Sequence, residues 1–300
     1  MKPLLLALPG NEVLGGRLAA LLEAEHAVPE IHYFPDGETY VRINADVKAR
    51  DIIIVCSLDR PDAKFLPLIF LAETAKDLKA RTVGLICPYL AYMRQDKRFK
   101  PGEGITSAYF AKALSRHFDW LVTVDPHLHR RKSLSEIYMI PAATVHAGAA
   151  IAAWVRDNVP VPLIVGPDSE SAQWVAAVAR GANAPYIVAE KQRHGDHDVE
   201  VSVPDISPWR DRTPVMVDDI ISTAHTLIET VRALQTAGAS DIVAAGVHGL
   251  FAATAYDELS AAGAVKIVTC NTIAHPSNAI DVTAILAGAA RELMRAHKSR

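Results

Sequence analysis

Residues 213–234 read TPVMVDDIISTAHTLIETVRAL, and this stretch decides the fold because it contains a strand, a loop and a helix in that order. The apolar run that begins at Thr213 ends in two carboxylates, Asp218 and Asp219, and is typical of a buried strand. Residues 227–234 have apolar side chains at helical spacing. A strand that leads through a small hydroxylic loop into a helix is the building unit of a parallel α/β protein.

The same alternation extends through the whole chain. Short apolar runs predict buried strands at 4–8, 51–57, 82–87, 120–124, 162–166, 185–189, 214–217, 241–247 and 265–270. Helices are predicted between many of them, at 11–24, 61–79, 105–117, 144–157, 169–180, 223–237 and 254–262, with a last one at 278–297. The fold class is therefore α/β, with two doubly wound, mostly parallel sheets flanked by helices.

The length of 300 residues suits two domains. Residues 135–144 interrupt the rhythm with a proline and no clear periodicity, so we expect the boundary there. The predicted domains are residues 1–142 and 143–300, and the last helix is amphipathic enough to pack on either.

The bulk charge argues against two classes of partner. The net charge is −3 and the pI is about 6.5, so there is no general electrostatic attraction for nucleic acid or for an anionic membrane. We expect neither partner, and a phosphate ligand must then be held by local geometry.

The cysteines and the N-terminus bear on location. Cys56, Cys87 and Cys270 are far apart and lie in or beside apolar runs, which predicts core thiols in a reducing compartment. The apolar start is short and is broken at Pro9, so it predicts a first strand and not a signal peptide. No apolar run reaches the length of a membrane helix, and we expect a cytoplasmic protein.

The loop after Asp219 has the chemistry of a sugar phosphate site. Hydroxyls of Ser222, Thr223 and Thr226 lie at a predicted helix N-terminus, where free N–H groups and the helix dipole favour a phosphate. The neighbouring carboxylates suit the hydroxyls of a ribose. The alternative is a solvated Asp pair followed by ordinary helix capping. Neither a Walker loop nor a Rossmann fingerprint is present.

Residues 217–226 (VDDIISTAHT) resemble the phosphoribosyl pyrophosphate loop of type I phosphoribosyltransferase folds. Most of the chain resembles one family in particular, ribose-phosphate pyrophosphokinase. The resemblance implies two tandem type I phosphoribosyltransferase-like domains, with ATP bound in the first and ribose 5-phosphate in the second. It assigns these loop residues to ribose 5-phosphate: Asp218, Asp219, Ser222, Thr223, Ala224, His225 and Thr226.

Two motifs in the first half resemble family loops that bind ATP. Residues 34–38 (FPDGE) are similar to Phe-x-Asp-Gly-Glu, and residues 88–98 (PYLAYMRQDKR) are similar to Pro-Tyr-x-x-Tyr-x-Arg-Gln-Asp. A guanidinium suits triphosphate oxygens. The alternatives are an ordinary turn and a solvated basic loop. The resemblance assigns these residues to ATP: Phe34, Asp36, Gly37, Glu38, Arg94, Gln95 and Asp96.

Two further motifs are implied to bind metal. Residues 124–127 (VDPH) are similar to the family's Asp-Leu-His, which implies that His127 binds the Mg²⁺ that bridges the ATP phosphates. Without the resemblance, a lone His more often makes ordinary hydrogen bonds, since Mg²⁺ prefers oxygen. Residues 165–171 resemble Pro-Asp-x-Gly-Gly and imply that Asp168 contacts Mg²⁺ and the ribose.

Residues 190–193 (EKQR) resemble the family's Asp-Lys-x-Arg at the root of a catalytic loop, and the polar residues 194–198 follow. The resemblance implies that Lys191 and Arg193 are catalytic and that Arg193 also contacts ribose 5-phosphate. Two exposed cations at a strand end are the alternative.

The chain departs from the family at three glycine positions. Glu170 and Ser171 replace two glycines after Asp168, and His225 replaces one in the phosphate loop, where it either adds a cationic donor or points to solvent.

The activity implied is transfer of pyrophosphate from ATP to the anomeric hydroxyl of ribose 5-phosphate, with Mg²⁺ as cofactor, in a homo-oligomer with the site near a subunit interface. A phosphoribosyltransferase and a non-catalytic regulatory homologue of the synthetase are the two alternatives. The ATP-type motifs disfavour the first, and retention of Lys191, Arg193, His127 and Asp168 disfavours the second.

Overall fold

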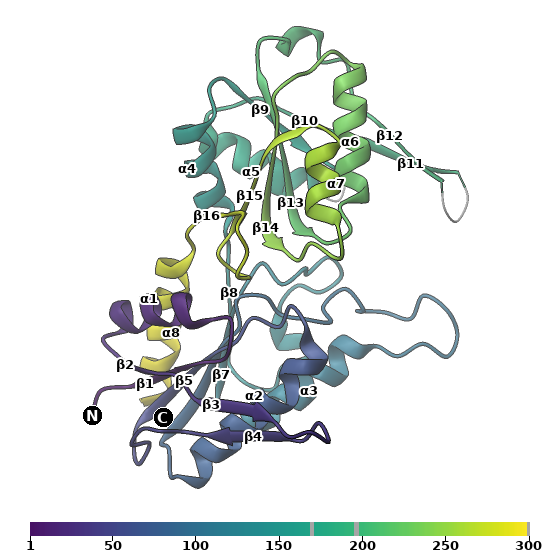
Figure 1. Ribbon diagram of the computed structural model, residues 1–300. Coiled ribbons are helices and arrows are strands. Elements are labelled where there is room, and N and C mark those ends of the chain that lie inside the picture. The colour runs from purple at the N-terminus through teal and green to yellow at the C-terminus, as the bar shows by residue number, and fades with distance from the viewer. Residues whose placement is uncertain (169–170, 195–197, 299–300) are drawn as a thin grey trace. The chain divides into compact units, whose positions relative to one another are not determined.

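The structure is a computed structural model that describes residues 1–168, 171–194 and 198–298, with the backbone alone for 191–194, 198–200 and 298 (Figure 1). The chain forms two compact units. One is Met1–Val145 together with Val282–Arg300, and the other is His146–Asp281. The boundary expected after residue 142 lies inside a strand of the first unit, and as a division into domains it stays a prediction.

The first unit is built on a six-stranded parallel sheet. Its strands are β1 (Leu4–Ala7), β2 (Glu25–Ala27), β5 (Asp51–Val55), β6 (Thr82–Ile86), β7 (Trp120–Val124) and β8 (Ala142–Val145). Their order across the sheet is β2-β1-β5-β6-β7-β8. Every residue of β5, β6 and β7 is buried, because helices cover both faces of a parallel sheet.

Four helices flank this sheet in two pairs: α1 (Glu12–Leu22) with α8 (Thr283–Lys298), and α2 (Pro61–Asp77) with α3 (Thr106–His117). Arg291 of α8 donates a 2.7 Å hydrogen bond to the main-chain oxygen of Leu21. An antiparallel hairpin, β3 (Glu30–Tyr33) and β4 (Thr39–Arg42), lies beside α2 (Figure 1).

The second unit repeats the plan with another six-stranded parallel sheet. Its strands are β9 (Pro162–Gly166), β10 (Tyr186–Val188), β13 (Thr213–Ile221), β14 (Ile242–Gly249), β15 (Ala264–Cys270) and β16 (Asn278–Ile280). Their order is β10-β9-β13-β14-β15-β16. The core includes Val165, Met216, Leu227 and Val231, so it joins β9 and β13 to the helix that follows β13.

Two helix pairs also cover this sheet: α4 (Gly148–Asn158) with α5 (Ala172–Ala182), and α6 (His225–Thr236) with α7 (Ala255–Ala261). A second antiparallel hairpin, β11 (Glu190–His194) and β12 (Asp198–Ser202), follows β10, and β12 runs beside α6 (Figure 1).

The strand orders locate the point where each sheet changes winding direction. In the first unit β1 lies between β2 and β5, and in the second β9 lies between β10 and β13. Ligands of open α/β sheets bind outside the carboxyl ends of the strands at this switch point. The loops after β9 and β13 therefore occupy the expected ligand position in the second unit.

The predicted fold class is confirmed, and each apolar run named above is a strand. Two local expectations were wrong. The helix expected over 278–297 begins at Thr283, because Asn278–Ile280 pair with β15 as an edge strand. The segment expected to be irregular near residue 140 contains β8, an edge strand that is only half-buried and so lacks a strong apolar pattern.

The three cysteines are free and buried, as expected. Within the described part of the chain, no helix combines the length and the apolar character needed to cross a bilayer.

Candidate active site

Two carboxylates lie within β13 of the second unit. The predicted strand ended at residue 217 and placed the two acids after it. The observed strand continues through Ile221, so Asp218 and Asp219 lie within its last part. Asp218 pairs in register with Gly246 of β14, and both acids are half-buried. This placement gives the acids the rigid support of a central strand.

The electrostatics of this acidic group are distinctive. Burial, followed by the negative charges of Asp219 and Asp168, raises the pKa of Asp218 well above its ordinary value. The Asp219 N–H donates a 2.9 Å hydrogen bond to Asp218 Oδ1. A cation or several hydroxyl donors would relieve the repulsion among these carboxylates, and their oxygens are the donors that Mg²⁺ prefers.

The loop between β13 and α6 has the form of an anion site. Ser222 and Thr226 are half-buried, Thr223 and His225 are exposed, and α6 begins at His225. The N–H groups of the first helical turn have no partner within the helix, and the dipole of α6 adds positive potential there. The loop is held by a 3.0 Å hydrogen bond from Ala252 N–H to the Ser222 oxygen.

Ala224 adopts a backbone conformation that favours glycine. Its φ is +58° and its ψ is +3°, in the left-handed region, and the residue is 7% exposed. An L-residue with a Cβ is strained there. The sequence showed the substitution at His225, but not that its neighbour carries the strained backbone.

Asp168 follows β9 at the other side of the switch point. The Ser171 N–H donates to Asp168 Oδ1 at 3.1 Å, and the Ser171 hydroxyl donates to the Asp168 main-chain oxygen at 2.6 Å. Glu170, one of the expected departures, lies outside the described residues. The turn is therefore closed by a serine where the family has a glycine.

The expected catalytic pair lies in the β11–β12 hairpin. Lys191 pairs in register with Val201, and Arg193 pairs with Val199. The polar segment expected beyond them includes residues 195–197, which lie outside the described residues.

In the first unit, the Phe34–Glu38 motif forms the turn of the β3–β4 hairpin. Phe34 N–H donates to the Glu38 oxygen at 2.8 Å, and Gly37 N–H donates to the Phe34 oxygen at 2.8 Å. Gly37 has φ +90°, which explains the glycine. The Asp36 carboxylate accepts from Glu38 N–H at 3.2 Å, so Asp36 helps to close the turn.

An aromatic group surrounds this turn. His32 stacks on Tyr40 with ring centroids 4.4 Å apart, and Phe34 meets His32 edge-on at 5.3 Å. Phe34 remains 45% exposed. An exposed ring with fixed neighbours can stack on a planar base.

The loop after β6 carries the next three expected ATP residues. Arg94 and Gln95 are exposed, and Gln95 accepts a hydrogen bond from the Thr106 hydroxyl of α3. The Asp96 carboxylate is only 3% exposed and is paired with Arg130. Arg94 and Gln95 thus present polar groups to solvent, whereas Asp96 points its carboxylate into a protein contact.

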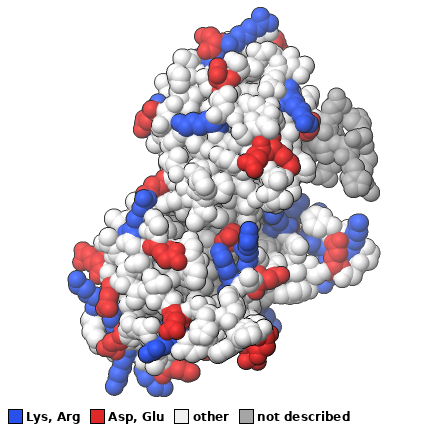
Figure 2. Space-filling model, viewed as in Figure 1, with Lys and Arg blue, Asp and Glu red and all other residues white. Residues whose placement is uncertain are grey.

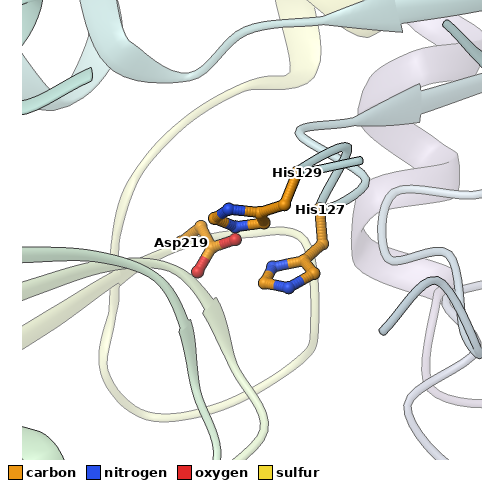
Figure 3. A group of neighbouring side chains, drawn as sticks. All are labelled: His127, His129 and Asp219. Carbon is orange, nitrogen blue, oxygen red and sulfur yellow. The ribbon is translucent and has the colours of Figure 1, made fainter. Parts of the chain in front are cut away.

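The loop after β7 carries His127. Asp125 and His127 have φ of +31° and +53°, so the chain turns sharply on both sides of Pro126. The imidazoles of His127 and His129 lie side by side with centroids 4.0 Å apart (Figure 3). Asp219, the third labelled residue, is the β13 carboxylate described above. Strained backbone conformations of this kind are common at ligand-binding and active sites, so the turn is a candidate part of such a site.

Apart from the Phe34–Glu38 turn and the β11 pair, the expected residues fall into two groups. Asp168, Asp218 and the loop through Thr226 share the carboxyl edge of the second sheet, while Arg94, Gln95, Asp96 and His127 lie on adjacent loops of the first. Sequence reasoning did not find Thr106, Arg130 or Arg131. The basic run at 130–132 was readable, but its contact with Asp96 was not, because the two residues are 34 positions apart.

Comparisons with known proteins agree with this architecture. A family model described as the N-terminal domain of ribose phosphate pyrophosphokinase matches residues 4–117, and a phosphoribosyl transferase domain model matches residues 133–284. A crystal structure of phosphoribosylpyrophosphate synthetase from Mycobacterium smegmatis has a TM-score of 0.84, with 23% identity over 98% of this chain and 99% of that one. This likeness establishes the fold.

Two relatives are close enough in sequence to establish the family. The ribose-phosphate pyrophosphokinase of Sulfurisphaera tokodaii is 34% identical over 91% of this chain and 92% of its own length. That of Methanopyrus kandleri is 33% identical over 93% of this chain and 96% of its own length. The chain belongs to the ribose-phosphate pyrophosphokinase family.

Proposed function

We propose that this protein transfers pyrophosphate from ATP to the anomeric hydroxyl of ribose 5-phosphate and releases AMP. The observation that carries the proposal is the arrangement of the β13 acids and the β13–α6 loop at the sheet switch point. The carboxylates are suited to ribose hydroxyls, and the loop that follows them leads to a helix N-terminus suited to a phosphate, so one site offers partners for both parts of a 5-phosphorylated ribose.

On this proposal the loop from Ser222 to Thr226 binds the 5-phosphate. Hydroxyls of Ser222, Thr223 and Thr226 and the first N–H groups of α6 are the donors. Asp218 and Asp219 accept hydrogen bonds from the ribose hydroxyls. The exposed His225 adds no required contact.

The first unit binds ATP. Phe34 and its turn, with Asp36, Gly37 and Glu38, contact the adenine, and Arg94 and Gln95 contact the nucleotide from the loop after β6. Support comes from the exposure of Phe34, Arg94 and Gln95 on fixed loops.

In the reaction a bond forms between the anomeric oxygen and the β-phosphorus, and the bond between that phosphorus and the α–β bridging oxygen breaks. The hydroxyl proton is lost and AMP leaves. Negative charge grows on the bridging oxygen and on the β and γ oxygens, so catalysis is mainly positioning and charge stabilisation. Lys191 and Arg193 are the cations proposed to stabilise that charge.

Mg²⁺ is the proposed cofactor. Burial, followed by the negative charges of Asp219 and Asp168, raises the pKa of Asp218, and carboxylate oxygens gathered in this way suit an oxygen-binding cation held by Asp168. His127 is the proposed ligand on the ATP side. When bound, the ion neutralises phosphate charge and fixes the geometry of the triphosphate.

We also propose a homo-oligomeric, cytoplasmic enzyme with no nucleic acid or membrane partner. Support comes from the exposed aromatic turn of the β3–β4 hairpin, because the family resemblance assigns this turn to ATP and implies an active site near a subunit interface. The mass of the protein in solution tests this part separately.

The test is to incubate the protein with Mg²⁺, ATP and ribose 5-phosphate and to follow products by phosphorus NMR. We expect AMP and a pyrophosphorylated sugar, formed only when ribose 5-phosphate is present. Unphosphorylated ribose is the matched control and should give no AMP. Formation of ADP contradicts the proposal, and absence of turnover with intact ligand binding supports a regulatory homologue instead.

A further inference from the structure

An ion pair joins the two loops that follow β6 and β7 in the first unit. Arg130 Nη1 lies 3.0 Å from Asp96 Oδ1 and 3.3 Å from Asp96 Oδ2. Asp96 is on the loop that carries Arg94 and Gln95, and Arg130 is three residues after His127. The pair therefore connects two loops that are both proposed to bind ATP.

The burial of Asp96 limits what its carboxylate can do. The side chain is 3% exposed, and both oxygens are within hydrogen-bonding reach of Arg130. A buried carboxylate that is already paired is a poor ligand for a nucleotide, and its negative charge would repel phosphates. Asp96 thus has the properties of a residue that positions its partner.

A second arginine braces the same loop. Arg131 Nη2 donates to the main-chain oxygen of Asp96 and to the Ser107 hydroxyl of α3, both at 3.3 Å. The Asp96 carboxylate and its backbone are therefore held by consecutive arginines, which restrains where Arg130 can point.

Arg130 keeps donors for a ligand. Its side chain is 43% exposed, and within the described part of the chain its Nε and Nη2 donate no hydrogen bond. A guanidinium with two free N–H donors on one side matches a phosphate group.

A second cation lies beside it. Arg130 Cζ is 5.6 Å and Lys97 Nζ is 5.0 Å from the centre of the Phe99 ring, which is 59% exposed. Lys and Arg atoms lie on the loop that projects beside α3, together with some Asp and Glu atoms (Figure 2). Two cations around one exposed ring make a positive surface suited to a polyanion.

We infer that Arg130 binds the polyphosphate chain of ATP and that Asp96 is the positioning residue that holds its guanidinium in place. This inference rests on the proposed function and changes the role expected for Asp96, which contacts Arg130 and not the nucleotide.

The experiment uses Arg130→Met, Asp96→Asn and the double variant in steady-state kinetics, with Mg-ATP and ribose 5-phosphate varied in turn. Arg130→Met is expected to raise the KM for ATP by roughly 10- to 100-fold, the effect of losing hydrogen bonds to a charged group. The KM for ribose 5-phosphate should change less than about threefold. Asp96→Asn should raise the KM for ATP, and the double variant should be no worse than Arg130→Met.

The matched control is Lys132→Met, which removes a cation from the same basic run and should leave the KM for ATP within about twofold. Arg130→Lys keeps the charge without the planar fork and should recover part of the loss. An unchanged KM in Arg130→Met overturns the inference, as do additive effects of the two substitutions.

Calorimetric titration of Mg-ATP separates this inference from the proposed function. Should the protein form no AMP, the proposed reaction fails, yet weaker ATP binding by Arg130→Met than by Lys132→Met still supports the Arg130 site. Equal binding by both variants contradicts it.

Discussion

The Ser171 hydroxyl donates a 2.6 Å hydrogen bond to the main-chain oxygen of Asp168, and the Ser171 N–H donates to the Asp168 carboxylate at 3.1 Å. Gly166 makes room for this serine, because a Cβ at Gly166 would lie 2.8 Å from Ser171 Oγ and 2.8 Å from Val175 Cγ2. Ser171 stands where the family has a glycine, and the absence of a side chain at Gly166 leaves room for it.

Substitution at Gly166 should therefore disturb Asp168. Gly166→Ala is expected to displace Ser171 and to raise the KM for ribose 5-phosphate about 10-fold, whereas Ser171→Ala, which keeps the N–H bond, should raise it only a few-fold. Gly148→Ala is the control, since its nearest neighbour is 3.5 Å away. Equal KM values for Gly166→Ala and Gly148→Ala would show that Ser171 does not position Asp168.

Ala224→Gly should stabilise the protein. The left-handed φ of +58° costs an alanine about 1 kcal/mol more than a glycine, so the free energy of unfolding should rise by roughly that amount. Urea denaturation measures it. Ala233→Gly, inside α6, is the opposite control and should lower the stability by about 1 kcal/mol. A lower free energy of unfolding in Ala224→Gly would contradict the inference that the backbone at Ala224 is strained.

Lys191→Ala should lower kcat far more than it weakens ribose 5-phosphate binding. A cation that acts on charge developed in the transition state affects turnover by about 100-fold or more, while ground-state binding changes little. Kinetics and calorimetric titration of the sugar phosphate give the two quantities. Gln192→Ala, at the next position of β11, is the control. Equal losses in kcat and affinity would make Lys191 a binding cation only.

Gly84→Ala should destabilise the first unit. A Cβ at this position of β6 would lie 1.9 Å from the Trp120 ring, which is fully enclosed in the sheet core. Overpacking of this kind costs about 1–3 kcal/mol or more, and the thermal midpoint should fall. Gly288→Ala in α8 meets no atom within 4 Å and should raise the stability by about 0.5–1 kcal/mol. Similar melting of both variants would argue against this packing.

The sequence by itself determined the α/β class and the positions of the central strands. Strands such as β5 and β6 are buried on both faces, so nearly all of their side chains are apolar. Such a run of apolar residues can be recognised in the sequence without knowledge of the fold. The edge strands β8 and β16 were missed because they are only partly buried and lack that pattern.

The sequence also determined the order of the chemical motifs, since two acids near the end of a strand, followed by a loop and a helix, form a local pattern at Asp218 and Asp219. Only the tertiary structure decided which side chains meet. The Asp96 carboxylate pairs with Arg130 from another loop, and Ser171 closes a turn through space left by Gly166. The physical reason is that sheet order brings distant loops to one edge, and those through-space contacts leave no periodic trace along the chain.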